Sequence, residues 1–189
     1  MFEQAVPTEN LFLRENLFLR DVDTLRQRTI RLLAEGRADT GINPQRSIAL
    51  LQAVLTAEIV CVLRYTAISI SHDGLKNEWI GAEFQEQAND ERRHMALAAT
   101  RIVQLGGTPD YNPEPLASRH TVAPDGPGEF AQRIQENLAA EQAVVELYRE
   151  LIGYFEPRDP ESAAILHEII HDEEDHASDM EDLLVSYIN

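Results

Sequence analysis

The sequence predicts an all-α protein: an antiparallel four-helix bundle with one long crossover, preceded by an N-terminal helical extension. Apolar residues recur every three or four positions through four long segments, the period of a helix that buries one face. Two of the three connections between these segments are short, whereas the middle one is long and rich in Gly and Pro. A chain of 189 residues is long enough to bury one such core.

The helices of the bundle are expected over about 44–71, 74–105, 129–155 and 161–187. The stretch "GGTPDYNPEPLASRHTVAPDGPG" separates the second helix from the third, and "EPRDP" separates the third from the fourth. Two short turns and one long middle connection exclude a simple up-down-up-down bundle. Residues 45–189 are therefore expected to form the bundle.

Residues 1–44 are expected to form a separate N-terminal extension. They contain the hexamer "ENLFLR" twice without a break, which is either a short duplication or an artificial addition. Val22, Leu25, Ile30, Leu32 and Leu33 then follow a helical period, so one amphipathic helix is predicted, ending near "EGRADTG".

The net charge of −17 comes from 33 acidic and 16 basic residues, and residues 1–46 hold seven of each sign. This acidity argues against binding to nucleic acid or to an anionic membrane, and it suits a protein that handles cations. We expect no apolar run to approach the ~20 residues of a membrane span. The first residues lack a secretion-signal pattern, and the single Cys61 cannot form an internal disulfide. A cytoplasmic protein is expected.

One glutamate interrupts the apolar stripe of each predicted bundle helix. These residues are Glu58, Glu91, Glu141 and Glu173. The first two are 33 residues apart with a midpoint at Gly74, and the last two are 32 apart with a midpoint at Pro157. Because an antiparallel hairpin folded at its midpoint brings both members to one depth, all four should meet.

Two histidines are predicted to join these glutamates, because His94 and His176 each lie three residues beyond a glutamate on the same helix face. Buried carboxylates repel one another or take up protons unless cations balance them, and no Lys or Arg occupies these stripes. Two divalent cations would balance four carboxylates. This pattern of ligands is the one found in ferritin-like di-iron bundles. The alternative is that these glutamates lie at the rim of the bundle and reach water.

The segments "LLQAVLTAEIVCVLRY", "ANDERRHMALAATRIVQLGGTP", "ENLAAEQAVVELYRELI" and "IIHDEEDHASDMEDLL" resemble the ferritin-like superfamily, most closely its bacterioferritin and Dps-like branch. The resemblance covers about residues 45–189. It implies that the ferroxidase ligands are Glu58, Glu91, His94, Glu141, Glu173 and His176, with Glu91 and Glu173 bridging the metals. It also implies that Tyr65 lies beside that site and that Asp90 and Asp172 hold the ligand histidines. For these two acids, a solvated helix face is the alternative.

The sequence departs from this family at three places. Arg92 follows Glu91 where haem-binding bacterioferritins have a methionine ligand, so no haem is expected. Only 13 residues follow His176, too few for the fifth helix that lines the pores of large cages. A homo-oligomer is therefore expected as a dimer or a twelve-subunit shell rather than a 24-subunit one. The first 44 residues have no counterpart in the family.

The function that these features predict is ferroxidase activity: two Fe(II) ions per subunit are oxidised by O2 or H2O2, and the ferric product is stored. Mn or Zn could substitute for iron, because carboxylate and imidazole ligands discriminate weakly. The alternative is a manganese catalase-like or other di-metal redox enzyme. A shell that protects DNA would need a basic tail, which the charge-neutral N-terminal section does not supply. "HEIIH" resembles a zinc-protease motif, but His167 and His171 are predicted to point away from the core stripe.

Overall fold

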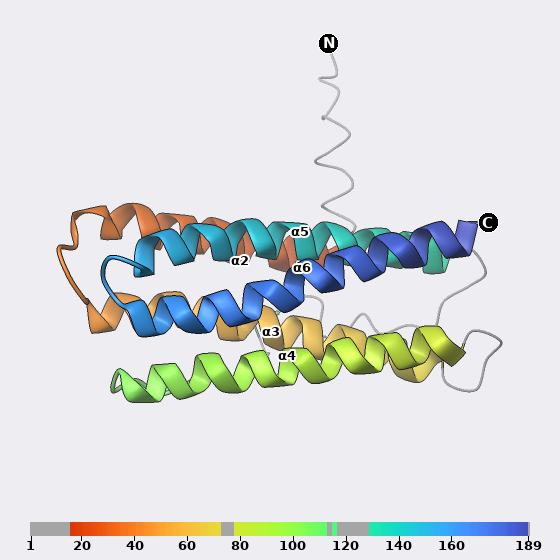
Figure 1. Cartoon of the computed structure of the whole chain (residues 1–189), viewed down its shortest axis with the longest axis horizontal. Coiled ribbons are helices and arrows are strands. Elements are labelled where there is room, and N and C mark those ends of the chain that lie inside the picture. Colours follow the sequence, from red (N-terminus) through yellow and green to blue (C-terminus); the bar gives the residue numbers. More distant parts are fainter. Residues whose placement is uncertain (1–15, 73–77, 113–114, 117–128, 189) are drawn as a thin grey trace, which may run out of the picture.

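The computed structural model describes residues 16–72, 78–112, 115–116 and 129–188, and this part of the chain is helical without strands. The elements are α2 (Leu17–Glu35), a 3-10 turn η1 (Gly36–Ala38), α3 (Pro44–His72), α4 (Glu78–Gln104), α5 (Glu129–Phe155) and α6 (Pro160–Ile188). The predicted all-α fold is therefore confirmed (Figure 1).

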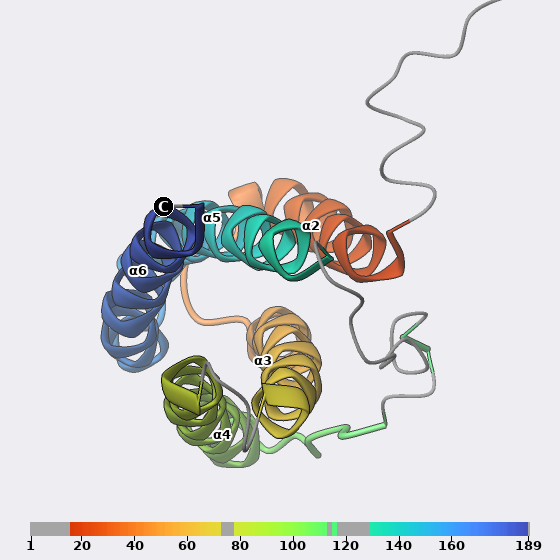
Figure 2. The same ribbon diagram turned by 90° about the vertical axis from the view of Figure 1, so that its right-hand side faces the viewer.

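Helices α3 to α6 form a four-helix bundle made of two antiparallel hairpins, α3 with α4 and α5 with α6 (Figures 1 and 2). Helix α4 ends at the opposite end of the bundle from the start of α5 (Figure 1). The connection between them therefore has to span the length of the bundle, as predicted, although residues 117–128 lie outside the described part.

The bundle helices begin and end within one residue of the predicted bounds wherever the described residues allow a comparison, whereas α2 begins before the residues from which it was predicted. Helix α2 begins at Leu17, before Val22, because Asn16 Oδ1 accepts hydrogen bonds from the backbone N–H groups of Phe18 and Leu19, both at 3.1 Å. This N-cap belongs to the second "ENLFLR" copy, and the first copy lies outside the described residues. Helix α4 is described from Glu78, so the expected turn at 74 lies outside the described residues too. Helix α6 begins one residue early, at Pro160.

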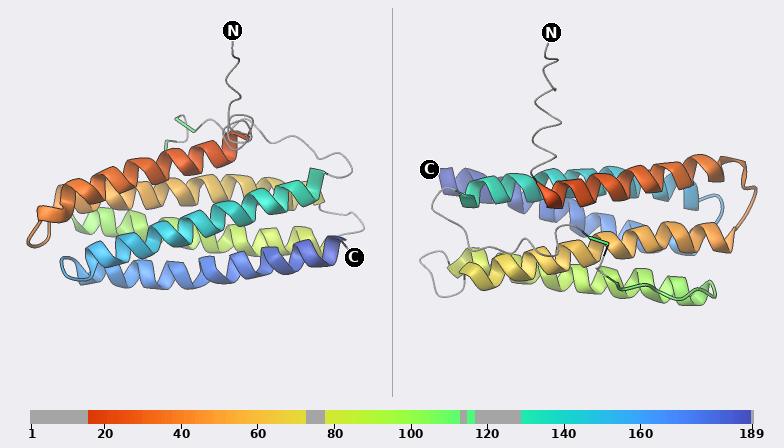
Figure 3. Two further views of the ribbon diagram at one scale, coloured as in Figure 1. Left: turned by 90° about the horizontal axis from the view of Figure 1, so that it is seen from above. Right: turned by 180° about the vertical axis from the view of Figure 1, so that it is seen from behind.

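Helix α2 lies along the bundle against α3 and α5, and Figure 3 shows its course from two further sides. Its Phe18 ring is 1% exposed and belongs to the main apolar cluster. The Arg64 guanidinium lies 3.9 Å from the centroid of that ring, donates to Glu136 Oε2 at 2.8 Å and also donates to Asn137. Helix α2 thus covers one side of α3, the first helix of the bundle.

The other end of α2 is attached through Asp39, which follows η1. Its Oδ2 accepts hydrogen bonds from Arg46 Nε at 2.8 Å and from the Tyr154 hydroxyl at 3.0 Å. Gly36 fits beneath these side chains because it lacks a Cβ, which would lie 2.5 Å from Arg46 Cδ and 2.8 Å from Tyr154 Cε2. Helix α2 is therefore bound to the bundle at both of its ends.

Helix α3 is the most apolar of the described helices. Its Pro44–Ser71 segment is long and apolar enough to cross a membrane by length and composition, which corrects the expectation that no run approaches that length. However, 61% of the apolar window is buried inside the bundle, as in the core helix of a soluble protein. A helix that is apolar on nearly every face is expected where other helices pack on more than one side of it, and α3 has that place in the bundle.

The apolar core is divided into two clusters along the bundle. One contains residues such as Leu51, Ile102 and Phe155, and the other contains residues such as Phe84 and Met180. The level between the clusters is the level of the four glutamates predicted to meet. The fold thus places a polar layer across the middle of an apolar core.

Candidate metal centre

The structure brings all six predicted ligands together. Their donor atoms form two overlapping groups, each with all its atoms within 4.8 Å of one another. The groups are Glu58, Glu91, His94 and Glu173, and Glu91, Glu141, Glu173 and His176. Each glutamate is at most 1% exposed and His176 is 4% exposed, so the rim alternative does not fit. Glu91 and Glu173 belong to both groups, as bridging ligands would.

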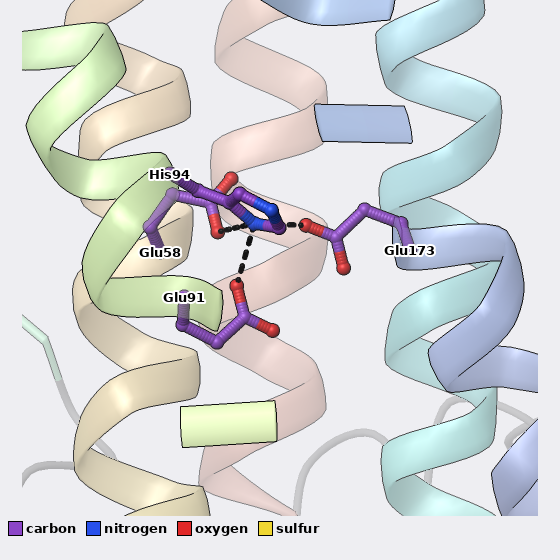
Figure 4. Close-up of side chains that lie close together, drawn as sticks. All are labelled: Glu58, Glu91, His94 and Glu173. Carbon is purple, nitrogen blue, oxygen red and sulfur yellow. Dashed lines mark hydrogen bonds and ion pairs between the residues drawn. The ribbon is translucent and has the colours of Figure 1, made fainter. Parts of the chain in front are cut away.

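Both histidine rings direct Nδ1 into the cluster. His94 Nδ1 lies 3.1 Å from Glu173 Oε1, 3.3 Å from Glu91 Oε2 and 3.6 Å from Glu58 Oε2, and Figure 4 shows the ring facing these carboxylates. His176 Nδ1 lies 3.3 Å from Glu173 Oε2 and 3.4 Å from Glu91 Oε1. Nδ1 is therefore the nitrogen that each imidazole would offer to a cation.

The two aspartates expected to hold these histidines each lie near the histidine of the other helix, between α4 and α6. Asp172 of α6 approaches His94 of α4, with 2.9 Å between Oδ2 and Nε2, which is a hydrogen bond. Asp90 of α4 approaches His176 of α6, but 3.7 Å separates Oδ2 from Nε2. Both are partly exposed, and the structure places each beside a ring nitrogen that faces away from the cluster.

Two tyrosines also reach the cluster, and sequence reasoning assigned a role to only one of them. Tyr65 of α3 donates its hydroxyl hydrogen bond to Glu141 of α5, and Tyr148 of α5 donates to Glu58 of α3. Both tyrosines are fully buried. Tyr148 stands seven residues after Glu141, as Tyr65 stands seven after Glu58. That repeated spacing is the signal that could have found Tyr148.

The two hairpins thus contribute equivalent sets of side chains. The α3 residues recur in α5 at an offset of 83 positions, and the α4 residues recur in α6 at an offset of 82. The pairs are Glu58 with Glu141, Tyr65 with Tyr148, Asp90 with Asp172, Glu91 with Glu173, and His94 with His176. The site therefore has approximate two-fold symmetry between hairpins.

Burial and mutual repulsion perturb the titration of the cluster. Burial raises the pKa of Glu58 and of Glu141 well above the usual range, and repulsion from Glu173 adds to it. Burial alone would lower the pKa of His176, but contacts with Glu173 and Glu91 outweigh it and raise that pKa to about 12. Burial alone would raise the pKa of Glu91, but interactions with Glu58 and with both histidines outweigh it and lower that pKa to about 2. Protons thus balance part of the charge that cations would otherwise balance.

Several oxygen and nitrogen atoms of the cluster that could ligate a metal make no hydrogen bond to any residue in the described part of the chain. They are Glu91 Oε1, Glu141 Oε2, both carboxylate oxygens of Glu173 and both ring nitrogens of His176. Buried polar atoms without partners are costly, so their presence in one layer indicates a ligand. Carboxylate oxygens with imidazole nitrogens are the donors that first-row divalent cations accept. The residues therefore fit a pair of such cations.

The other residues singled out in the sequence lie outside the set of predicted ligands. His167 and His171 are exposed and form ion pairs with Glu156 at 3.2 Å and Asp175 at 3.3 Å, outside the buried cluster. Cys61 is buried, and burial raises the pKa of its thiol, so it behaves as a packing residue. Arg92 is exposed and donates to Thr66 Oγ1 at 2.7 Å.

The fold and this buried cluster define a ferritin-like protein. The family described as Ferritin-like domain matches residues 48–187, and the chain belongs to that family. Among curated proteins, it is similar to the "DNA protection during starvation protein" of Pyrococcus furiosus, with 27% identity over 149 residues, covering 77% of this chain and 80% of the relative.

Two solved structures share the fold. One is the bacterioferritin-related protein of Bacteroides fragilis, described as a dodecameric thioferritin, with a TM-score of 0.66 and 24% identity over 86% of this chain and 95% of that one. The other is the bacterioferritin of Rhodobacter capsulatus, described with a metal-free dinuclear site and haem iron, with a TM-score of 0.63 and 24% identity. It covers 78% of this chain and 88% of that chain.

Proposed function

We propose that the protein is a ferroxidase that binds two Fe(II) ions per subunit in the buried cluster and oxidises them with O2 or H2O2. The ferric product is then stored or removed from reactive chemistry. The observation that most strongly supports this proposal is the set of buried carboxylate and imidazole atoms without hydrogen-bond partners in the described residues. Membership of the ferritin-like family supports iron as the metal.

In this proposal Glu58 and His94 hold one ion, Glu141 and His176 hold the other, and Glu91 and Glu173 bridge them. The chain supplies the geometry and the negative charge, while the iron supplies the electrons. Tyr65 and Tyr148 orient the two terminal carboxylates through their hydroxyl groups. Asp172 and Asp90 lie beside the outward ring nitrogens.

The Glu91→Ala variant tests the proposal, because Glu91 belongs to both ligand groups. Stopped-flow absorbance should show fast Fe(II) oxidation in the parent protein and only slow oxidation in the variant. Glu174→Ala is the matched control: it removes the same charge from the exposed position next to Glu173. A Glu91→Ala protein that oxidised Fe(II) at the parent rate would remove the cluster from the reaction.

Metal identity is tested separately, because the same donors accept manganese and zinc. Peroxide disproportionation by the Mn-loaded protein, without growth of a ferric mineral, would favour a manganese catalase-like enzyme instead.

We propose that haem is not bound, since Arg92 occupies the position of the methionine ligand and donates a hydrogen bond to Thr66. Absorbance after incubation with haemin tests this.

We further propose that the protein is a cytoplasmic homo-oligomer, a dimer or a twelve-subunit shell, in which residues 1–44 are an extension of a 45–189 domain. Exposed apolar side chains, among them Ile70 at 69% and Trp79 at 52%, are suited to contact between subunits. Light scattering gives the mass of the assembly.

Binding to DNA is not expected from an acidic chain. The archaeal relative is named for DNA protection, so the expectation is tested by a gel shift at low salt with the metal-free protein.

A further inference from the structure

The two histidines of the cluster have equivalent positions in the two hairpins but different supports. The residue before His94 is Arg93, and its counterpart 82 positions later, before His176, is Asp175. The ligands of the two hairpins match in pairs, but at this position the match fails. A positively charged arginine in α4 corresponds to a negatively charged aspartate in α6.

Arg93 joins a chain of contacts that ends at the His94 ring. Its Nη1 lies 2.8 Å from Glu168 Oε1, and its Nη2 donates to Asp172 Oδ2. The same Asp172 oxygen lies 2.9 Å from His94 Nε2. Because Asp172 is held from the other side by the guanidinium, its carboxylate is fixed in position to accept the Nε2–H of His94. This leaves Nδ1 of His94, which faces the carboxylates, as the ring nitrogen that would bind a cation in the cluster.

His176 lacks such a chain. Asp175 is exposed and forms an ion pair with His171 at 3.3 Å, pointing away from the cluster. Asp90 Oδ2 lies 3.7 Å from His176 Nε2, too far for a hydrogen bond, and Arg93 is 3.7 Å from the other oxygen of Asp90. Neither ring nitrogen of His176 makes a hydrogen bond to a described residue. Its ring is therefore less constrained than that of His94.

We propose that Arg93 is a positioning residue that acts through Asp172 on His94 and makes the two cation positions unequal. The position formed by Glu58, Glu91, His94 and Glu173 binds a divalent cation before the position that includes His176. A ligand already fixed in its tautomer and orientation loses less freedom on binding, and removing such an outer partner weakens metal affinity about 10–100-fold. This inference rests on the proposed function, since it assumes that cations occupy the cluster.

The sign of the effect separates positioning from simple electrostatics. Arg93 brings a positive charge near the site, so by Coulomb repulsion alone its removal would strengthen cation binding. If Arg93 acts by positioning Asp172 and His94, its removal should weaken cation binding instead. Arg93→Ala should weaken binding although it removes a positive charge, and Arg93→Lys should restore part of the affinity because an ammonium still pairs with Asp172.

Titration of the metal-free full-length protein with Co²⁺, followed by d–d absorbance and calorimetry, tests this. The parent should bind two equivalents in two resolved steps. Arg93→Ala and Asp172→Ala should weaken the first step about 10–100-fold. Asp90→Ala should change either step less than Asp172→Ala does. The control Arg92→Ala removes the same charge one residue earlier, where it contacts Thr66 and Asn89, and should leave both steps unchanged.

The Nε2–H resonance of His94 in the Zn-loaded protein gives a second readout. It should be protected from exchange in the parent and lose that protection in Arg93→Ala. Two equal steps in the parent, or a first step unaffected by Arg93→Ala, would overturn the inference while leaving the metal centre intact. If Glu91→Ala bound Co²⁺ as the parent does, the proposed function itself would fail.

Discussion

The hydroxyl of Tyr148 donates a hydrogen bond to Oε1 of Glu58, so a buried phenol from α5 holds a buried carboxylate from α3. The Tyr148→Phe variant should keep the fold but lose about 1–2 kcal/mol of stability to urea unfolding, because Glu58 is left with an unsatisfied buried oxygen. Fe(II) oxidation should slow about tenfold or more, since a ligand has lost the group that orients it.

Tyr154→Phe is the matched control for this variant. Tyr154 also donates to a carboxylate, Asp39 at 3.0 Å, but at the end of the bundle away from the cluster. Its loss should change stability without changing the oxidation rate. If both variants oxidised iron at the parent rate, Tyr148 would have a purely structural role.

Metal loading should release protons. Burial and neighbouring carboxylates raise the pKa of Glu58 and Glu141, and contacts with the carboxylates outweigh burial and raise the pKa of His94 and His176. These shifts favour the protonated forms of all four groups in the metal-free protein, and bound cations should displace protons from them. Because protons compete with the cation, affinity should fall as pH falls.

Calorimetry in two buffers of different ionisation enthalpy at pH 7 measures that release directly. Zn²⁺ suits the measurement because it undergoes no redox change. An affinity that stayed constant between pH 6 and pH 8 would contradict the protonation pattern.

The ion pair between Arg101 and Asp159 should matter to stability much more than a surface pair. Its Nη2–Oδ1 distance is 2.6 Å, and the two side chains are 6% and 2% exposed. Arg101→Met leaves a buried carboxylate without its cation and should cost about 3–5 kcal/mol. Arg149→Met breaks a pair with Glu174 whose side chains are 60% and 50% exposed, and it should cost less than about 1 kcal/mol. Equal urea midpoints for the two variants would contradict this difference.

Deleting one copy of "ENLFLR" should change the free energy of unfolding much less than removal of the Phe18 ring does. The remaining copy supplies the same N-cap and the same buried phenylalanine as Asn16 and Phe18 do now. Phe18→Ala should instead cost about 3–5 kcal/mol by thermal or urea unfolding, because the ring is 1% exposed. A large loss from the deletion alone would show that residues 9–14 make stabilising contacts of their own.

Periodicity was sufficient to predict the bundle and the convergence of the six predicted ligands. An antiparallel hairpin converts equal distances from a turn into equal depth, so Glu58 and Glu91 could be placed level from their numbering. The apolar period that predicted α2 begins at Val22, so it did not locate the start of the helix, whose cap, Asn16, lies in the repeat that precedes it.

Interactions between distant segments were not predictable in this way. Arg64 meets Asn137 across 73 positions, and Arg93 meets Asp172 across 79. No repeat in the sequence relates such partners, and each is a polar or charged residue that would equally suit a solvated face. Tyr148 is different: its spacing from Glu141 repeats that of Tyr65 from Glu58, so comparison of the hairpins would have found it.

The polar layer that divides the apolar core has a consequence for folding. Three of the six predicted ligands belong to the α3–α4 hairpin and three to the α5–α6 hairpin, so bound cations would cross-link two halves that only the crossover joins covalently. Resistance to denaturation should therefore rise with cation supply, by about 2.7 kcal/mol when the free ion is at a hundred times its dissociation constant. Under a strong chelator, the first event of unfolding should be the separation of the two hairpins.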